Sequence, residues 1–477
     1  MPLPRPSKLT LGAGLGPLSN RPAEFQNQTT LVLDQNKRPR FAAISRRVLA
    51  LPHEILAEIF IQCLPNDEFI APSPRTVPLL LCSVCRQWRM VALTNPKLWR
   101  SLDIRLAGTP DYIELYQNWL SRAANTPLSI SLHASADHTT ADSPAKALFQ
   151  TIVRLSPQWR NVDLTGARAA LRCLLPEEGR FPLLAKLTIT HRDDDYPISF
   201  LDAPNLREVH ALQYLTRSLR LPWSQLTLFR ADEVALSCCL EVLRHTSNLV
   251  NATLHFGTED SPSGVSLPPL IHLRSLTLCG PWSNGEKALS AVLDSLTVPA
   301  LKTLTLRFPY NLRLPFDISP FVGLSLRSSF QLQTLVLYHM PTTTEALIQC
   351  LKVVPSIVHL KIGPTYRVDM KQIYTRLARS TDFLPKLESF HAIFTSEVSY
   401  VWRQDIPALL QMLPWRWAAV GVARLRSFQL AHTYSNDDFD ETLTSHSQFL
   451  RLVEQGMELY VGKARPIVDS FPNLVDI

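Results

Sequence analysis

Two cysteines spaced as Cys82-x-x-Cys85 form the most specific arrangement of reactive side chains in this sequence. This spacing suits half of a zinc site or a redox pair. A structural zinc site needs four ligands, and no second pair with this spacing follows. Both cysteines fall inside an apolar stretch with helical periodicity, from Leu79 to Asn95. We therefore interpret them as small residues of a helix core rather than as metal ligands.

Two acidic clusters also contain groups that bind metals or basic partners. One places His191 beside Asp193, Asp194 and Asp195, and the other contains Asp437, Asp438, Asp440 and Glu441. The first directly follows a predicted strand, and the second lacks the glycine and the final glutamate of a calcium-binding loop. Both patterns favour solvated loops over a nuclease or calcium site.

Tryptophan alternates with arginine in Trp415-Arg416-Trp417, and a second pair is Trp402-Arg403. Aromatic rings between basic side chains can stack on the bases of a single strand. The other basic residues are scattered along the chain and the net charge is only +7. We therefore favour local packing, with the arginines reaching past the rings to water.

The remaining signatures of enzymes are missing from the sequence. It contains no phosphate-binding glycine motif, no H-E-x-x-H and no G-x-S-x-G. We predict no catalytic residues, cofactor, metal, nucleic acid or membrane partner. No apolar run is long enough for a membrane helix, and the eight cysteines of the 477 residues fit a reducing compartment. The chain is expected to be an intracellular protein, cytoplasmic or nuclear, and not an enzyme.

The stretch from Leu51 to Leu102 predicts a compact helical module. Its first helix carries an apolar stripe at helical spacing, formed by Leu51, Ile55, Leu56, Ile59, Phe60 and Leu64. Prolines then interrupt the pattern, and a second helix is predicted from Leu79 to Asn95. Pro96 ends it, because the residue before a proline is disfavoured in the α conformation.

This module resembles the F-box, in the form common in mushroom-type fungi. The resemblance rests on Leu51-Pro52-His53-Glu54-Ile55-Leu56, Ile59-Phe60, the segment Cys82 to Trp88 and the tail Pro96 to Leu102. It implies binding to the Skp adaptor of an SCF-type ubiquitin ligase and, through the adaptor, to a cullin. The implied adaptor-binding residues, some of which must form the internal core instead, are Leu51, Pro52, Ile55, Leu56, Ile59, Phe60, Val84, Cys85, Trp88, Leu98 and Trp99.

After Trp99 the chain repeats an L-x-x-L-x-L phrase at intervals of roughly 20 to 29 residues, the period of a repeat array, with longer steps from Leu304 to Leu335 and from Phe390 to Phe428. Its middle apolar residues include Val162, Leu187, Val209, Ala252, Leu276, Leu304, Leu335, Leu360, Phe390 and Phe428, and one shorter phrase is Leu226-x-Leu228. Helical periods lie between phrases, as in Glu286 to Leu296 and Thr344 to Val353. A repeat made of one strand and one helix buries its apolar face by stacking on the neighbouring repeats.

These phrases resemble leucine-rich repeats in their L-x-x-L-x-L half, although most lack the Asn or Cys that follows the strand. The predicted fold class is α+β with an αβ repeat, a small N-terminal helical F-box followed by an irregular leucine-rich-repeat-like solenoid. An ordinary α/β domain with leucine-rich strands is the alternative. The predicted domains are a flexible leader (1–42), the F-box (43–102) and a substrate-recognition solenoid (103–477).

Together these predictions describe the substrate-recognition subunit of an SCF-type E3 ubiquitin ligase, whose substrate is an unidentified protein. Two alternatives remain, a leucine-rich scaffold with a degenerate F-box and an F-box protein without a role in ubiquitin transfer. The substrate is expected on the strand side of the array, at the positions between leucines. Predicted contact residues are Lys302, Thr303, Thr305 and Arg307.

Overall fold

The computed structural model describes residues 51–106, 111–134, 145–164, 179–190, 198–212, 219–257, 266–280, 285–308, 316–364, 368–394, 401–432 and 443–463. The chain divides into two units, Met1–Leu56 and Ala57–Ile477, and only Leu51–Leu56 of the first are described. The predicted leader and the two acidic clusters, at His191 and at Asp437, lie outside the described residues.

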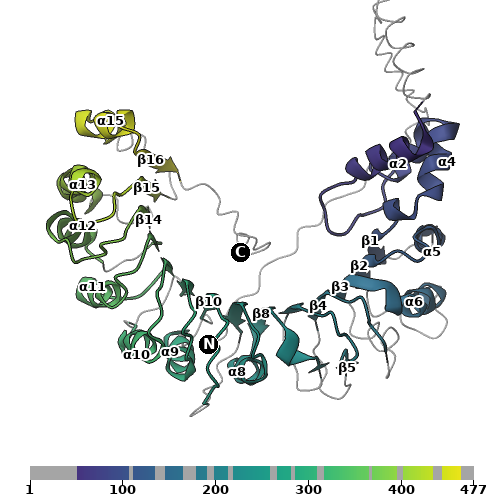
Figure 1. Cartoon of the computed structure of the whole chain (residues 1–477), viewed down its shortest axis with the longest axis horizontal. Helices are drawn as coiled ribbons and strands as arrows, with labels where there is room; N and C mark the ends of the chain where they lie inside the picture. The colour runs from purple at the N-terminus through teal and green to yellow at the C-terminus, as the bar shows by residue number, and fades with distance from the viewer. Residues whose placement is uncertain are drawn as a thin grey trace, which may run out of the picture. The chain divides into compact units, whose positions relative to one another are not determined.

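The helices come in two groups, an N-terminal module and a series that alternates with strands (Figure 1). The module contains α2 (His53–Gln62), α3 (Leu79–Val84), α4 (Arg86–Thr94) and the short η2 (Pro96–Leu98). The series contains α5 (Asp111–Arg122), α6 (Ala145–Arg154), α8 (Leu236–His245), α9 (Gly285–Ser295), α10 (Ser319–Ser328), α11 (Thr344–Lys352), α12 (Met370–Arg379), α13 (Val401–Ala418) and α15 (Ser447–Glu454). Two further short turns are η4 (Ser156–Gln158) and η5 (Trp223–Gln225).

The strands of the second unit form one parallel sheet of 14 strands in chain order, and a separate pair, β5 (Ile198–Ser199) and β7 (Leu219–Arg220). The sheet contains β1 (Ser101–Leu106), β2 (Leu128–Ala134), β3 (Trp159–Leu164), β4 (Lys186–Thr190), β6 (Glu208–Leu212), β8 (Leu228–Val234), β9 (Asn251–Phe256), β10 (Ser275–Cys279), β11 (Thr303–Arg307), β12 (Thr334–Tyr338), β13 (His359–Ile362), β14 (Ser389–Phe394), β15 (Ser427–His432) and β16 (Glu458–Lys463). A helical N-terminus followed by an α/β repeat is therefore confirmed.

Alternating burial explains why each phrase becomes a strand. In β11, Leu304 and Leu306 are fully buried, whereas Thr303, Thr305 and Arg307 between them are half-buried. A strand points successive side chains to opposite faces, so the leucines meet the helices and the polar residues line the other face. The middle residues of successive phrases are paired in register, as in Leu276 with Leu304 and Leu304 with Leu335.

One phrase was predicted in the wrong register. Leu228 pairs with Glu208 at the start of β8 and does not face the core, whereas Phe229 and Ala231 are completely buried. Because side chains alternate, a shift of one residue moves the whole strand pattern to the opposite face. The correct phrase is Leu226-x-x-Phe229-x-Ala231, with an aromatic ring in place of the central leucine.

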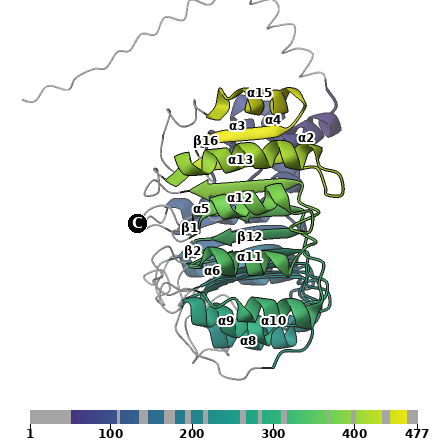
Figure 2. The ribbon, with the colours of Figure 1, turned by 90° about the vertical axis from the view of Figure 1, so that its left-hand side faces the viewer.

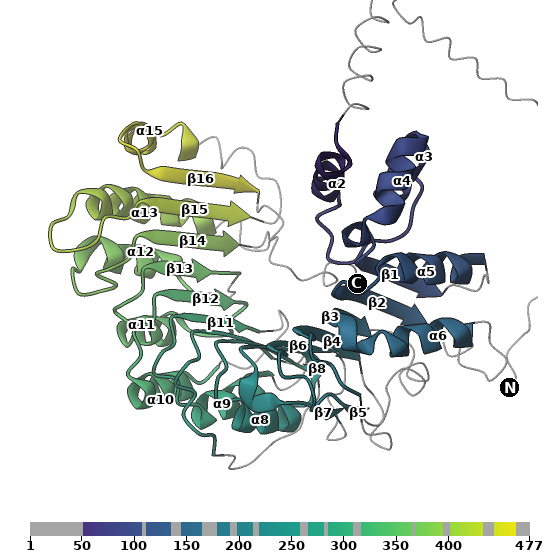
Figure 3. The same cartoon turned by 45° about the vertical axis from the view of Figure 1, so that its right-hand side comes forward.

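The helices cover one face of the sheet, and within the described residues no helix lies on the other face (Figures 2 and 3). Helix α11 shows the pattern that directs this packing. Its buried residues Leu347, Ile348 and Leu351 follow helical spacing, and Thr343 caps its N-terminus by accepting a hydrogen bond from the Ala346 N–H. The helix-free face is the surface on which the polar strand residues gather.

The segment that follows α2 is tied to the start of the sheet. The Asp103 N–H donates to the Ile70 carbonyl at 2.9 Å, and the Ser101 hydroxyl donates to the Glu68 carbonyl at 2.8 Å. The Glu68 carboxylate in turn lies 2.6 Å from the Lys186 ammonium of β4. The predicted domain boundary after Leu102 therefore falls inside β1, in a region with hydrogen bonds on both sides of it.

Candidate functional site

The eleven predicted adaptor-binding residues separate into an exposed and a buried set. Ile55, Ile59 and Val84 are exposed at 49%, 44% and 53% of their surface, and Pro52 is exposed as well. Leu51, Cys85 and Trp88 are half-buried. Leu56, Phe60, Leu98 and Trp99 are no more than 1% exposed. Only the first two sets have surface with which to bind another protein.

Two other side chains of the module share the features of the exposed set. Leu80 in α3 and Met90 in α4 are exposed at 41% and 52%. Large apolar side chains on the surface of short helices commonly mark a protein contact, because burying them removes apolar area from water. Neither was among the predicted adaptor-binding residues, although Leu80 lies on the predicted apolar side of the second helix.

The buried set holds the module together. The rings of Phe60 and Trp88 lie 5.0 Å apart, joining α2 to α4. The Trp99 indole donates from Nε1 to the Ala92 carbonyl at 2.8 Å and packs edge-on against Trp119 of α5, with 4.9 Å between ring centroids. Trp99 thus acts in this structure as a core residue that connects the module to the first α/β repeat.

The sequence pattern predicted that Cys82 and Cys85 lie on one helix. In the structure they do not. Cys85 has an extended backbone with φ −158°, and it separates α3 from α4. Its Sγ accepts a hydrogen bond from the Trp88 N–H at 3.5 Å, which caps the start of α4. The apolar period continues across this break because both helices pack on the same core, so periodicity alone could not reveal it.

The predicted substrate residues lie on and beside β11. Thr303, Thr305 and Arg307 occupy alternate positions on the helix-free face, and Lys302 is exposed just before the strand. Arg307 is directed at a neighbouring ring, with its guanidinium carbon 4.7 Å from the centroid of Tyr338 on β12. The ammonium of Lys361 on β13 lies 5.4 Å from the same centroid. Tyr338 and Lys361 were not among the predicted residues.

A second polar cluster on this face was missed entirely. The Asp232 carboxylate of β8 lies 2.6 Å from His210 Nε2, 2.9 Å from the Arg230 guanidinium and 2.9 Å from His255 Nδ1. Burial raises the pKa of Asp232, but the hydrogen bonds from these three partners outweigh it and hold that pKa well below its usual value. The only available signal was the alternation Phe229-Arg230-Ala231-Asp232, which puts two opposite charges on one face.

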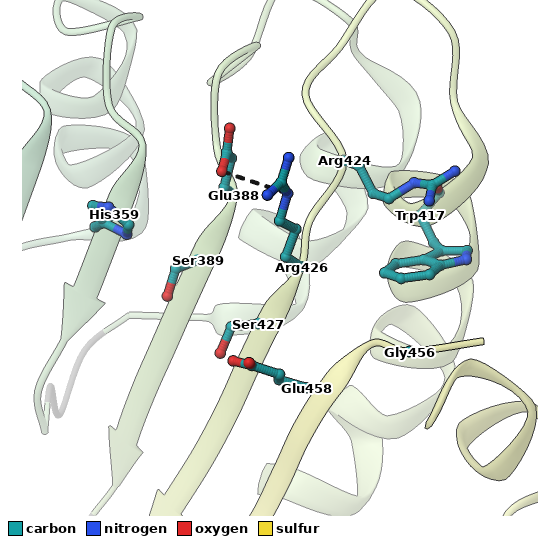
Figure 4. A pocket seen from close by; sticks show the side chains of 9 residues that line it. All are labelled: His359, Glu388, Ser389, Trp417, Arg424, Arg426, Ser427, Gly456 and Glu458. Carbon is teal, nitrogen blue, oxygen red and sulfur yellow. Dashed lines mark hydrogen bonds and ion pairs between the residues drawn. The ribbon is translucent and has the colours of Figure 1, made fainter. Parts of the chain in front are cut away.

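A polar pocket of about 660 Å³ lies near the starts of β13 to β16 (Figure 4). Trp417 and Arg424 form one side, with the guanidinium 4.6 Å from the indole ring. Glu388 and Arg426 form an ion pair at 3.7 Å on the opposite side, and Glu458 is also in the lining. This charged lining differs from the mostly apolar lining of small-molecule sites. The residues predicted on β11 do not reach this pocket.

The sequence predicted that Trp415-Arg416-Trp417 packs locally and that its arginine reaches past the rings to water. The arginine is packed, but it does not reach water. Trp417 lines the pocket, whereas Arg416 is fully buried. It donates to the carbonyl oxygens of Leu377, Phe383 and Leu384, and burial lowers its pKa to about 10. The guanidinium therefore satisfies carbonyls at the end of α12 and in the turn that follows.

The described residues contain no group of three or more His, Cys, Asp or Glu side chains that could hold a metal ion. They also contain no helix that is both long and apolar enough to span a membrane. In the Asp232 cluster, His210 and His255 both hydrogen-bond to the Asp232 carboxylate. These two histidines therefore have a structural role.

Comparison with known families gives one match. Residues 48–105 match the family model described as F-box-like, which spans the helical module and β1. No curated protein matches the chain. The match supports an F-box-like N-terminus, and its end at residue 105 agrees with the hydrogen bonds that join the module to β1.

Proposed function

We propose that this chain is the substrate-recognition subunit of an SCF-type E3 ubiquitin ligase. The observation that carries the proposal is the F-box-like match over residues 48–105 together with apolar side chains that its helices leave exposed. F-box domains bind Skp-type adaptors, and the adaptor links them to a cullin. In this proposal the exposed set, Pro52, Ile55, Ile59 and Val84, supplies the adaptor contact.

The α/β repeat would then hold the protein substrate. Its parallel strands with helices on one face fit an irregular leucine-rich-repeat-like solenoid. Domains 43–102 and 103–477 would have separate partners, with 1–42 as a leader. The link through Trp99 and Trp119 supports this arrangement, because a rigid connection sets the position of a bound substrate.

The chain itself would carry out no bond chemistry. Its contribution is to raise the effective concentration of substrate lysines near the transfer step, an effect that needs binding and geometry alone. An intracellular location, cytoplasmic or nuclear, follows from this role as part of the proposal.

The testing experiment is capture of the Skp adaptor by the full chain. Ile59→Gln/Val84→Gln removes two exposed apolar side chains from the module without changing charge or emptying its core. Ile271→Gln/Leu326→Gln is the matched control, since these residues are 56% and 73% exposed outside the module. We expect the first variant to lose capture by about tenfold or more and the control to retain it.

Loss of capture counts only if circular dichroism shows that the variant still melts like the wild type. Failure of the wild type to capture the adaptor would overturn the proposal and leave a leucine-rich scaffold. Capture without ubiquitin transfer in a reconstituted assay would indicate an F-box protein with another use for its adaptor.

A further inference from the structure

The register of the sheet brings one position of each repeat from β3 to β12 into a row along the edge where the strands begin. In β11 this position is Lys302, directly before Thr303, the first strand residue on the helix-free face. The Lys302 N–H donates to the Arg274 carbonyl at 2.9 Å, and the Gln333 N–H donates to the Lys302 carbonyl at 2.8 Å. Because these strands are parallel, the equivalent residues of neighbouring repeats lie side by side (Figure 3). We name this set of residues the strand-start row.

The strand-start row carries positive charge only. Its residues, in strand order, are Arg160, Ala185, Arg207, Thr227, Val250, Arg274, Lys302 and Gln333. Four of them are basic and none is acidic. Basic residues that are scattered in the sequence are therefore aligned by the pairing of the strands.

The four cations of the row are accessible to a partner. All are exposed, and within the described residues none of them forms an ion pair with a carboxylate. The Arg207 guanidinium donates to the backbone carbonyls of Pro204 and Leu206 at 2.9 and 3.0 Å, which orients the group and leaves its charge uncompensated. An exposed arginine or lysine can form strong, charge-assisted hydrogen bonds with a carboxylate.

The core of each repeat fixes where these cations begin. Each cation directly follows a residue that is no more than 1% exposed, and these residues are Trp159, Leu206, Leu273 and Leu301. A buried side chain holds the backbone of the next residue in place. The spacing of the four Cα atoms is therefore set before any partner binds, which reduces the entropy cost of binding.

The acidic residues at and beside the row leave a net positive charge. Two nearby carboxylates already have basic partners, in the pairs Glu68–Lys186 and Arg180–Asp202. Glu208, next to Arg207, is the one acidic residue among the strand positions that follow the row from β3 to β12. The equivalent positions before β14 and β15 are Glu388 and Arg426, which pair with each other at 3.7 Å. The uncompensated cations thus lie between β3 and β11.

We propose that the strand-start row binds an acidic segment of the substrate protein, with glutamate or aspartate carboxylates at the four cations. This inference rests on the proposed function, because it names the class of protein that the repeat would hold. Adjacent strands lie about 4.8 Å apart, so the six steps from Arg160 to Lys302 span about 29 Å. An extended segment of about nine residues covers this length.

The composition of the row favours a polypeptide over a nucleic acid. Between β3 and β12, neither the row nor the strand position after it contains an aromatic side chain. Surfaces that bind single-stranded nucleic acids stack the bases on aromatic rings. Half-buried Ala185, Thr227 and Val250 separate the cations instead. The carbon stems of bound glutamates can pack on these small side chains, which removes apolar area from water.

The test measures binding of a fluorescent glutamate-rich peptide of about nine residues to the full chain, beside a glutamine-rich peptide of equal length. Two variants each remove two cations of the row, Arg160→Gln/Arg207→Gln and Arg274→Gln/Lys302→Gln. The matched control is Lys146→Gln/Lys287→Gln, which removes two exposed cations near the starts of α6 and α9. Since all six positions are exposed, each variant should melt like the wild type by circular dichroism.

We expect only the glutamate-rich peptide to bind, with an affinity that salt weakens. Each row variant should lower this affinity by about tenfold, and the control should leave it unchanged. A loss confined to one of the two row variants would show that the four cations do not form one site, and the proposal would fail. An equal loss in the control variant would reduce the effect to net charge and also overturn it.

Adaptor capture is measured on the same samples. If the wild type captures the adaptor but the glutamate-rich peptide does not bind, the inference fails and the proposed function stands. If peptide binding follows the expected pattern but the adaptor is not captured, the proposed function fails and the acidic-segment site stands. A single-stranded oligonucleotide of equal charge that binds more tightly than the peptide, through the same four cations, would overturn the assignment to a protein segment.

Discussion

Trp99 and Trp119 pack edge to face with 4.9 Å between their rings, and this contact joins the helical module to the first α/β repeat. Each indole also donates a hydrogen bond, Trp99 to Ala92 and Trp119 to Ser101. The Arg122 guanidinium lies 4.6 Å from the Trp99 ring, on the same helix as Trp119. The two parts that the proposed function assigns to adaptor and substrate thus share one aromatic core.

Trp99→Ala and Trp119→Ala should therefore each destabilise the chain by about 3–5 kcal/mol, since each leaves a large cavity. Because the rings touch, the double variant should lose less than the two single effects added, by about 0.5–1.5 kcal/mol. Urea unfolding followed by tryptophan fluorescence and circular dichroism measures both. Trp417→Ala, at a half-buried ring, is the control and should cost less. Full additivity would contradict a shared core.

Arg416→Met should also destabilise the chain strongly. The guanidinium is fully buried and donates to the carbonyl oxygens of Leu377 and Leu384 at 2.8 and 2.9 Å. A methionine fills similar space but leaves these carbonyls without a donor, at about 1–3 kcal/mol for each. Arg424→Met, at an exposed arginine, should change the unfolding free energy by less than about 0.5 kcal/mol. Equal effects of the two substitutions would contradict the structural role of Arg416.

Asp232 should make stability depend on acid pH. Its pKa lies below the unfolded value of 3.8 because His210, His255 and Arg230 stabilise the carboxylate more than burial destabilises it. This stabilisation is fully present above pH 3.8 and is lost as the pH falls toward the folded-state pKa. Asp232→Asn should lower the urea midpoint at neutral pH, and its difference from wild type should shrink in acid.

Asp202→Asn is the control for this substitution. Asp202 pairs with Arg180 at 3.7 Å, but both side chains are more than half exposed, so removing the charge should have almost no effect. A difference between Asp232→Asn and wild type that stayed constant in acid would show that the carboxylate's charge is not what stabilises the cluster.

His391 should contribute a second pH dependence with its own window. Its pKa is about 4 in the folded chain against an ordinary value of 6.5, because burial and Lys361 disfavour the imidazolium. Between these values the unfolded chain binds a proton that the folded chain does not, so stability falls as the pH drops from 6.5 toward 4. In His391→Gln that part of the slope should disappear. Lys361→Gln should narrow this pH window from its acid end, since the pKa of His391 in the folded chain then rises toward its ordinary value.

Phe229→Ala tests the register of β8. Phe229 is fully buried and packs near Trp223, with 6.0 Å between their rings. Its loss should cost about 3–5 kcal/mol, whereas Leu228→Ala, at a half-buried position on the helix-free face, should cost much less. Both are measured by chemical unfolding, and a larger cost at Leu228 would restore the register inferred from the sequence.

Much of the fold follows from the sequence because its signals are periodic. Alternating leucines predicted β11 and β12, and a helical period predicted α11, since burial on one face selects the spacing. The β8 register was missed because the leucines at 226 and 228 imitate an alternation that belongs to Phe229 and Ala231. Only pairing with the neighbouring strands distinguishes the two faces.

The sequence by itself determined the helical module, its resemblance to the F-box and the array of strands and helices, because these depend on residues close together in the chain. Only the tertiary structure decided which module residues form a core and which remain exposed, as with Phe60 and Ile59. It alone brought Arg307, Tyr338 and Lys361 together and set His210 and His255 on Asp232. These residues come from different repeats more than twenty positions apart, and local spacing carries no information about which repeats pair in register.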